Sequence, residues 1–423
     1  MNNESKENFD VIIVGSGTCG STIARELCKQ KKRVLVLERG GNNPLKETFM
    51  GVAGIANQVS VSDKLNEMRA LTTGGTTSLY FAVADPPPID TFKSLGIDLS
   101  QDFDDIRNEL PICELPDNLL GAQALKLRDS AESLGYSWKK NKMLIDQSKC
   151  NSGYSYEAKW KAKSYMQDAL NYGAHLINRA LVSKIIIDNK KAIGVEYKIG
   201  NSPWSKTSRA YGSKIILSAG ALASPFILKN SGLKNVGCNG FYIDPNIVLF
   251  GSVPGLIGKD NFVGSMYTKL NDDIALGDAN VPRLFYKLMM LAKMKPFQIA
   301  SYNSSIAIGV KVKDAMSGGL RENGCYYKKL TDDVFKKLKV GEDAAVKILK
   351  NAGAKNIFNA GINAGGVGGL LQIKEHLDEN LQTEFENLYV CDHSLMPESS
   401  RVAPTLTLIC LAKYLSRKLL TAI

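Results

Sequence analysis

Three glycines near the amino terminus have the spacing that binds a dinucleotide. Gly15, Gly17 and Gly20 form a G-x-G-x-x-G run. In such a run the first glycine permits a tight turn, the second lets a pyrophosphate approach the backbone, and the third lets a helix pack closely on a strand. Backbone N–H groups at the start of that helix, which include Thr18, then provide an anion site. We therefore predict that Gly15, Gly17, Thr18 and Gly20 contact a dinucleotide cofactor.

The residues around this run predict the elements that position it. Residues 9–14 (FDVIIV) are continuously apolar and rich in β-branched side chains, which is typical of a strand buried on both faces. Residues 21–30 predict the helix that follows, and residues 33–37 predict a second strand. That strand ends at Glu38, whose carboxylate is placed to accept hydrogen bonds from a ribose hydroxyl, and we include the adjacent Arg39 in the site. The acid argues against NADP, but the pattern does not separate FAD from NAD.

Three further segments resemble the signatures of the glucose–methanol–choline (GMC) oxidoreductase family. Residues 72–78 (TTGGTTS) resemble the glycine-rich first signature, and residues 214–232 (KIILSAGALASPFILKNSG) resemble the second. Residues 387–419 resemble the carboxyl-terminal block, which is a strand, an Asp, a loop and a final helix. Together with the amino-terminal glycine run, the segments follow the family order. The resemblance implies that the cofactor is FAD.

The same resemblance implies further cofactor contacts. It places paired glycines, the end of a strand, the Asp of the last block and the start of the final helix beside the flavin or its diphosphate, and one backbone position beside the adenine. The dipole of the final helix would favour negative charge on the reduced flavin. The residues at these positions are Gly74, Gly75, Thr76, Val182 (adenine), Ala219, Gly220, Asp392, His393, Pro404 and Thr405.

Two positions depart from the family pattern where alcohol oxidation needs acid–base groups. Relatives carry a His before the last strand and a His or Asn before the last helix, and the matching residues here are Asn363 and Ala403. A neutral Asn cannot take a proton near pH 7. Of the three histidines, we expect His175 and His376 to lie on the surface. His393 has three open interpretations: a ligand of the ribityl or diphosphate, a relocated base, or a buried inert residue. Asn363 and His393 are the candidate catalytic residues.

The predicted fold is α/β with two domains, since 423 residues are too many for one average core. The resemblance implies a three-layer, FAD-binding Rossmann-type domain and a smaller α+β substrate-binding domain on an antiparallel sheet. The first domain would be discontinuous, with residues 1–85, 145–238 and 383–423, and the second would comprise residues 86–144 and 239–382. Residues 180–197 predict two strands joined by an Asp188-Asn189 turn.

Residues 283–294 (RLFYKLMMLAKM) combine helical apolar spacing with basic residues. One interpretation is a core helix with cationic ends. A second is a methionine-rich lid over a hydrophobic substrate, because methionine adapts to irregular apolar surfaces. A third is peripheral contact with a membrane, which the shortness of the stretch makes the weakest.

Composition limits the other partners. The net charge of +11 comes mostly from lysines spread along the chain, which indicates a solvated cationic surface and not a nucleic-acid site. The cysteines form no CxxC pair and no metal-like cluster, so we expect no metal site and a reducing cytoplasm. The polar amino terminus resembles neither a signal nor a transit peptide. Relatives that attach FAD covalently use a His in the first signature, and residues 70–90 contain none, so the resemblance implies non-covalent FAD.

The expected function is FAD-dependent oxidation of a small or hydrophobic alcohol-like substrate, or of another reduced organic molecule. The hydride would pass to flavin N5. The sequence does not identify the electron acceptor. Two alternatives stay open because the acid–base pair is altered: a non-redox or photochemical flavoenzyme (a lyase, isomerase or decarboxylase), or a non-catalytic FAD-binding protein.

Overall fold

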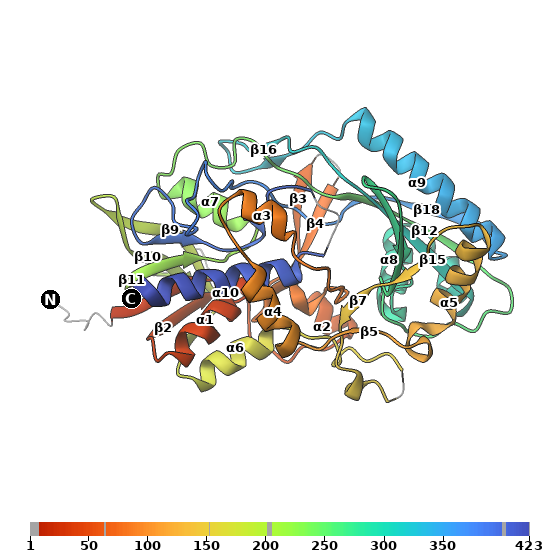
Figure 1. Ribbon diagram of the computed structural model, residues 1–423, viewed down its shortest axis with the longest axis horizontal. Coiled ribbons are helices and arrows are strands. Elements are labelled where there is room, and N and C mark those ends of the chain that lie inside the picture. Colours follow the sequence, from red (N-terminus) through yellow and green to blue (C-terminus); the bar gives the residue numbers. More distant parts are fainter. Residues whose placement is uncertain (1–7, 63–64, 152, 201–204, 400–402, 423) are drawn as a thin grey trace.

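Two sheets of different type organise the chain and lie toward opposite ends of the molecule (Figure 1). The computed structural model describes residues 8–62, 65–151, 153–200, 205–399 and 403–422. The carboxyl-terminal helix lies beside the first sheet, and the hairpin of β3 (Ala56–Ser62) and β4 (Leu65–Ala70) lies between the two sheets. The α/β fold class predicted from the sequence is confirmed.

The first sheet is mainly parallel and has seven strands in the order β8-β2-β1-β11-β10-β9, with β19 also paired to β11. The strands β1, β2, β8, β11 and β19 pair in parallel with one another. The pairs β11–β10 and β10–β9 are antiparallel. Burial on both faces explains the continuous apolar runs of β1 and β2. The strands are β1 (Asn8–Val14), β2 (Val34–Glu38), β8 (His175–Asn178), β9 (Ala180–Asp188), β10 (Lys191–Ile199), β11 (Thr207–Leu217) and β19 (Leu388–Val390).

The turn between β9 and β10 lies one residue later than the predicted Asp188-Asn189 turn, because Asp188 still pairs with Lys191. Asn189 and Lys190 both have positive φ, at 46° and 63°. Two successive left-handed residues define a type I′ turn, whose twist matches an antiparallel pair of strands. Asn tolerates this conformation because its short side chain bonds locally.

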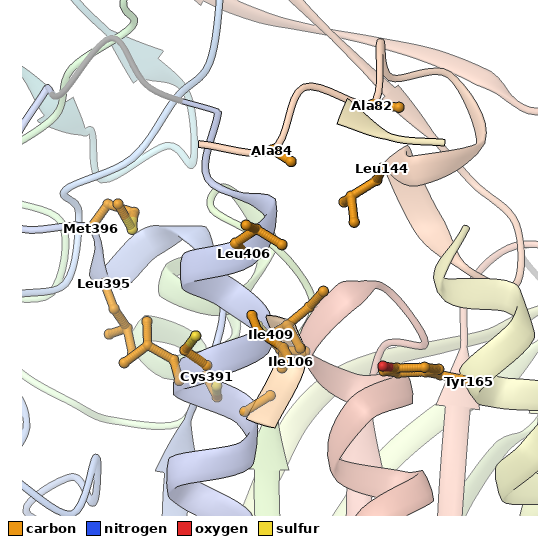
Figure 2. Close-up of a cluster of buried hydrophobic side chains, with 14 of the residues drawn as sticks. Ala82, Ala84, Ile106, Leu144, Tyr165, Cys391, Leu395, Met396, Leu406 and Ile409 are labelled. Atoms are coloured by element: carbon orange, nitrogen blue, oxygen red, sulfur yellow. The ribbon is translucent and has the colours of Figure 1, made fainter. Parts of the chain in front are cut away.

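Helices cover the first sheet and pack on one another. The helix α1 (Thr18–Lys29) contacts both α6 (Ala162–Asn171) and α10 (Thr405–Ala422). Figure 2 shows Leu406 and Ile409 of α10 beside Ile106 of α4 (Ser100–Glu109) in this apolar cluster. The helix α4 lies in the range assigned above to the substrate domain, yet it packs on the last helix of the other assigned range. The predicted domain ranges therefore stay predictions.

The second sheet is antiparallel throughout and has six strands in the order β18-β12-β15-β14-β13-β6. The long helix α9 packs against β12, β14 and β15, and α5 lies beside it. On the opposite face, Tyr286 and Met290 of α8 pack on Phe250 of β12. The elements are α5 (Asp117–Ser133), β6 (Lys139–Lys140), β12 (Pro245–Ser252), β13 (Met266–Asn271), β14 (Ile274–Asp278), α8 (Arg283–Ala292), β15 (Ser305–Val312), α9 (Asp332–Asn351) and β18 (Lys355–Ala364).

Shorter elements connect the two sheets. The segment that resembles the second signature contains the helix α7 (Ala223–Asn230). The remaining elements are α2 (Phe49–Ala53), α3 (Ile89–Ser94), β5 (Ile112–Glu114), β7 (Lys142–Leu144), β16 (Gly319–Leu320) and β17 (Tyr326–Tyr327). Across the described part of the chain, every helix is too short or too polar to pass through a bilayer.

Candidate active site

The three glycines of the amino-terminal run occupy three different environments. Gly15 has a φ of 99°, and a methyl group there would overlap the backbone of Ser218, which directly follows β11. A methyl group on Gly20 would overlap the carbonyl of Gly15, so this glycine allows α1 to pack closely on β1. Gly17 differs, because no protein atom lies within 4 Å of a Cβ built on it. The open space at Gly17 is what a pyrophosphate contacting the backbone requires.

The first signature lies directly against this turn. A Cβ on Gly75 would approach the Cα of Gly17 at 2.9 Å, and the N–H of Gly74 donates to the carbonyl of Ser16 over 3.0 Å. Gly74 and Gly75 have φ values of 90° and 58°. Thr76 is exposed at the same bend. The structure therefore brings together two glycine-rich segments whose contacting residues lie 58 positions apart and that the sequence assigned to one cofactor.

Glu38 lies at the end of β2 and is already hydrogen-bonded within the protein. Its Oε2 accepts from the N–H of Ser16 at 2.9 Å and from the Ser16 hydroxyl at 2.7 Å. Its Oε1 accepts from the N–H of Gly40 at 2.6 Å. The carboxylate thus organises the glycine turn, and the predicted bond to a ribose would use the remaining acceptor capacity of Oε1. Arg39 is exposed.

Arg69 belongs to this region and was not predicted from the sequence. It is half-buried on β4, and its Nε is buried without a hydrogen-bond partner. Burial lowers the pKa of Arg69, and the charge of the nearby Arg39 lowers it further. Two close cations with an unused donor suit an anionic group such as a diphosphate. No motif signalled this role, because only the fold brings β4 close to the end of β2.

Asp392 connects the second signature to the last block. Its Oδ2 accepts from the N–H of Gly220 at 3.0 Å and from the Ser224 hydroxyl at 2.5 Å. Its Oδ1 accepts from the N–H and the hydroxyl of Ser394 at 2.9 and 2.6 Å. The N–H of Ala219 donates to the Ser224 hydroxyl as well. Because four protein donors bond to this buried carboxylate, Asp392 holds the loops around the site in place. Gly220 itself has open space where a side chain would project, so its backbone is accessible to a cofactor.

The other predicted cofactor residues lie on three separate elements. Val182 is buried in β9 opposite Tyr197. Pro404 is half-buried and immediately precedes Thr405, where α10 begins. Just before them, the N–H of Ala403 donates to Oδ2 of Asp85 at 2.6 Å. Their contacts with FAD stay predictions.

Asn363 lies near the end of β18 in a row of polar residues. It is directly opposite Asn246 of β12, which in turn is opposite Lys311 of β15. Residues directly opposite one another in a sheet share a face, so these three side chains project from the same side. The amide of Asn363 donates to the carbonyl of Gly361 at 3.1 Å. This face also carries Phe250, on which α8 packs.

His393 follows Asp392 in a short 3₁₀ turn (His393–Leu395) and is half-buried. Its Nε2 lies 3.4 Å from the hydroxyl of Tyr242, and the two rings meet edge to face. Burial lowers the pKa of His393 to about 4, although the Asp244 carboxylate opposes this shift. The imidazole is therefore neutral at pH 7 and able to accept a proton.

Two glycines bring the Asn363 strand close to His393. A Cβ on Gly366 would lie 3.7 Å from Cε1 of His393 and 3.9 Å from Oδ2 of Asp244. The same Oδ2 pairs with Nζ of Lys311 at 3.0 Å. A Cβ on Gly365 would overlap the Asn246 amide at 2.5 Å and the Asp244 carbonyl at 2.6 Å. Glycine is therefore needed at position 365 to keep the polar cluster together, whereas a Cβ at position 366 would only make van der Waals contact with it.

Glu67 extends this cluster from the other side. It is half-buried on β4, opposite Val59, which packs on the apolar cluster that contains Phe241 and Ile243. Burial raises the pKa of Glu67 to about 7, while Arg69 and Lys311 act against this increase. A carboxyl group that titrates near neutrality is a second possible proton acceptor. The sequence analysis missed it, because burial of a hairpin carboxylate depends on long-range packing.

His376 corrects one prediction. Its side chain is only 6% exposed, whereas the sequence favoured a surface position. The N–H of Gln372 donates to its Nδ1 at 3.1 Å, and its Nε2 lies 3.2 Å from the carbonyl of Asn235. The imidazole thus ties two loops together, which the polar local sequence did not reveal. His175 is exposed as expected, at the first position of β8.

The glycine turn, the parallel sheet and the antiparallel sheet with its polar row define a Rossmann-type dinucleotide-binding oxidoreductase. A model described as an NAD(P)-binding Rossmann-like domain matches residues 13–43, and one described as GMC oxidoreductase matches residues 92–244. The chain belongs to the GMC oxidoreductase family. It is accordingly a flavin-dependent oxidoreductase, and the open backbone at Gly17 and Gly220 together with the unused donor of Arg69 fits FAD.

Relatives and solved structures match nearly the whole chain. An uncharacterized protein of Methanocaldococcus jannaschii is 26% identical over 97% of this chain and 100% of its own length. A long-chain-alcohol oxidase of Arabidopsis thaliana is 22% identical over 97% of this chain and 67% of its length. The crystal structure of pyridoxine 4-oxidase from Mesorbium loti superimposes with a TM-score of 0.74 at 14% identity, covering 97% of this chain and 99% of that one. A formate oxidase of Aspergillus oryzae, studied for FAD modification, gives a TM-score of 0.70 at 14% identity over 99% of both chains.

Proposed function

We propose that this protein oxidises an apolar alcohol with non-covalently bound FAD, and that His393 accepts the hydroxyl proton. FAD supplies the acceptor for the hydride that leaves the carbinol carbon. The observation that carries the proposal is a neutral imidazole located at the glycine segment that follows Asn363. A small-molecule substrate fits this arrangement better than a nucleic acid.

The role of His393 follows from its surroundings. The Tyr242 hydroxyl at Nε2 and a hydrogen bond to the Val367 backbone hold the imidazole in one orientation, and a substrate hydroxyl would take the place of Tyr242 at Nε2. The Asp244 carboxylate stabilises the imidazolium that forms when the proton arrives, and Lys311 reduces that effect. A His–carboxylate arrangement of this kind supports general-base catalysis, which typically contributes about 10²–10⁴-fold to rate.

Asn363 has a different role in this proposal. Its amide can donate to a substrate oxygen or accept from a substrate hydroxyl, but it cannot take the proton. Asn246, beside it on the same face, offers a second amide. We propose that the two amides orient the alcohol while His393 receives the proton.

A small cavity of about 10 Å³ with several aromatic side chains lies next to the first signature. Leu79, which directly follows that signature, lines it together with Phe81, Phe262 and Phe285. Phe285 comes from α8, so the helix that covers the polar sheet face also contributes to this pocket. Glu47 and Lys159, which lie 3.6 Å apart, line the same cavity, so an apolar group would meet the aromatic side chains beside an ion pair. Non-covalent binding of FAD is supported by the absence of histidine from residues 70–90.

The altered acid–base positions favour a second candidate function. Asn363 and Ala403 occupy both positions where the family carries its acid–base residues. A flavoenzyme without net redox, such as a photochemical decarboxylase, or a non-catalytic FAD-binding protein would not need those residues.

Anaerobic titration tests the proposal. Purified protein is mixed without oxygen with a panel of short- and long-chain primary alcohols, and the flavin absorbance is followed. Bleaching by an alcohol supports the proposal, and a His393→Gln variant that retains FAD should bleach about 10²–10⁴ times more slowly. Turnover that needs light and leaves the flavin oxidised would support the photochemical alternative instead. No response to the panel would favour the non-catalytic one.

A further inference from the structure

A surface patch at the carboxyl-terminal end of α8 has no role in the proposed chemistry. The patch, called here the α8 patch, has three apolar residues and three lysines. Its apolar residues are Leu291, Met294 and Phe297, which are 56%, 89% and 93% exposed. Its cationic residues are Lys287, Lys293 and Lys295.

Met294 has a backbone conformation that is unfavourable for a residue with a side chain. The N–H of Lys295 donates to the Met290 carbonyl, and the N–H of Met294 donates to the Leu291 carbonyl. This pair of bonds ends the helix in a Schellman motif, with Met294 at the left-handed position and a φ of 56°. Glycine is the favoured residue there, because a Cβ is disfavoured at positive φ. The chain instead places a large apolar side chain at this position and exposes almost all of it to solvent.

The charge around the α8 patch has a single sign. Between Asp278 and Asp314 the chain contains no acidic residue, whereas it contains six cations. Within the described part of the chain, the three lysines of the patch form no ion pair, although Nζ of Lys295 lies 4.5 Å from the centroid of the Phe358 ring. The patch therefore offers unneutralised positive charge beside exposed hydrocarbon.

The opposite side of α8 is firmly anchored. Tyr286 and Met290 are buried against Phe250, and the Tyr286 ring contacts both Phe250 and Tyr302 edge to face. An anchored helix that exposes apolar side chains among lysines is typical of proteins that insert shallowly into an anionic lipid surface. Positive charge attracts the lipid headgroups, and the apolar side chains enter the acyl boundary. A surface that binds a soluble protein more commonly has a polar rim with charges of both signs.

We propose that the α8 patch docks the protein on an anionic phospholipid surface. Leu291, Met294 and Phe297 would enter the boundary between headgroups and acyl chains, and the three lysines would contact the phosphates. Because α8 covers the sheet face that carries Asn246, docking places the candidate active site close to the membrane. The proposal concerns binding alone and does not depend on which reaction the site performs.

Co-sedimentation with vesicles tests this proposal on the full chain with its flavin. We expect binding to phosphatidylglycerol-containing vesicles and much weaker binding to pure phosphatidylcholine, with loss of binding as salt increases. Met294→Gly should weaken binding about tenfold or more, since it removes a buried apolar side chain. This variant suits the turn better than the natural residue, so it should fold. Each Lys→Gln change at positions 287, 293 or 295 should weaken binding about fivefold.

The matched control is Phe335→Ser on α9, where the ring is 49% exposed and far along the chain from α8. It should leave vesicle binding unchanged. Equal losses in Phe335→Ser and Met294→Gly would show that exposed apolar side chains bind lipid wherever they lie, and unchanged binding in Met294→Gly would show that net charge alone attracts the lipid. Either result would overturn the proposal. Absence of binding to anionic vesicles would also overturn it. So would a dimer in solution that Met294→Gly dissociates, because the patch would then bind a second copy of the chain.

Discussion

The hydroxyl of Tyr242 lies 3.4 Å from Nε2 of His393, and the planes of the two rings meet at 88°. The arrangement restrains the imidazole that we assign as proton acceptor. It also depends on Gly368, because a methyl group there would overlap the phenol of Tyr242. Gly368 thus gives Tyr242 the room to lie beside His393.

The first prediction separates cofactor binding from folding at the glycine turn. Gly17→Ala should fold normally, because its φ of −71° suits any residue and its Cβ meets no protein atom. It should nevertheless lose FAD, since the added methyl group occupies the space of the pyrophosphate. Flavin absorbance of the purified variant, combined with a thermal unfolding scan, measures both properties.

Gly20→Ala is the matched comparison, because its methyl group would overlap the Gly15 carbonyl. This variant should lose stability as well as flavin. A Gly17→Ala protein with full FAD occupancy would contradict the position that we assign to the pyrophosphate.

The second prediction concerns the pH dependence of flavin reduction. With a pKa of about 4, His393 remains neutral well below pH 7. If His393 accepts the proton, the rate should stay nearly constant as the pH falls and should drop only around pH 4. A drop around pH 7 would instead identify Glu67, whose pKa is raised to about 7. Stopped-flow measurements on the wild type and on Glu67→Gln distinguish the two residues.

Stability must be followed across the same range. The folded pKa of His393 lies below its ordinary value, so the unfolded chain binds more protons in the window between them. The contribution of this histidine is therefore present above that window, and it is lost as the pH falls toward 4. A melting curve at each pH separates loss of the fold from loss of the base.

The third prediction restores the family's residues at the altered positions. The double variant Asn363→His with Ala403→Asn should speed alcohol-dependent flavin reduction, because a second base is placed on the polar sheet face. The backbone bond from Ala403 to Asp85 uses the main-chain N–H and should survive the change. The gain should grow as the pH rises through about 6 to 7, when the new imidazole becomes neutral. An unchanged rate in a well-folded double variant would argue that Asn363 is far from the reacting atoms, and a lower rate would contradict the predicted gain.

The fourth prediction concerns a buried ion pair that supports the site. Nζ of Lys328 lies 2.9 Å from Oδ2 of Asp314 and donates to the Phe241 carbonyl, next to Tyr242. Both side chains are fully buried. Lys328→Met should lower the free energy of unfolding by about 3–5 kcal/mol, because it leaves Asp314 without a counter-charge. Lys329→Met is the control: that neighbour is exposed, and its change should stay within about 0.5 kcal/mol in denaturant melts.

Local sequence predicted the elements that depend on local chemistry. The strand, glycine run and acid around Gly17 and Glu38 lie as expected, since backbone conformation and close packing dictate those residue types. The turn at Asn189 followed from the same logic. Arg69 and Glu67 could not be found in this way. Their environments arise where β4 meets β2 and β18, and no spacing within the chain encodes such a meeting.

His376 is a residue for which the local sequence predicted the wrong burial. Its polar neighbours suggested exposure, but the Asn235 carbonyl contacts it from another loop. Likewise, the pairing of Lys311 with Asp244 joins residues that are 67 positions apart. The electrostatics of the site could therefore be determined only from the fold, whereas the cofactor class could be predicted from the sequence.

The most direct measurement of the central claim is anaerobic, single-turnover flavin reduction by a long-chain primary alcohol and by its C1-dideuterated form. If the protein transfers a hydride from alcohol to FAD, the flavin absorbance at its visible maximum should disappear with both substrates. Reduction should be slower with the deuterated alcohol, because the C–H bond breaks in that step. Flavin that stays oxidised across the alcohol panel while FAD is fully bound, or turnover that requires light and leaves the flavin oxidised, would contradict the account.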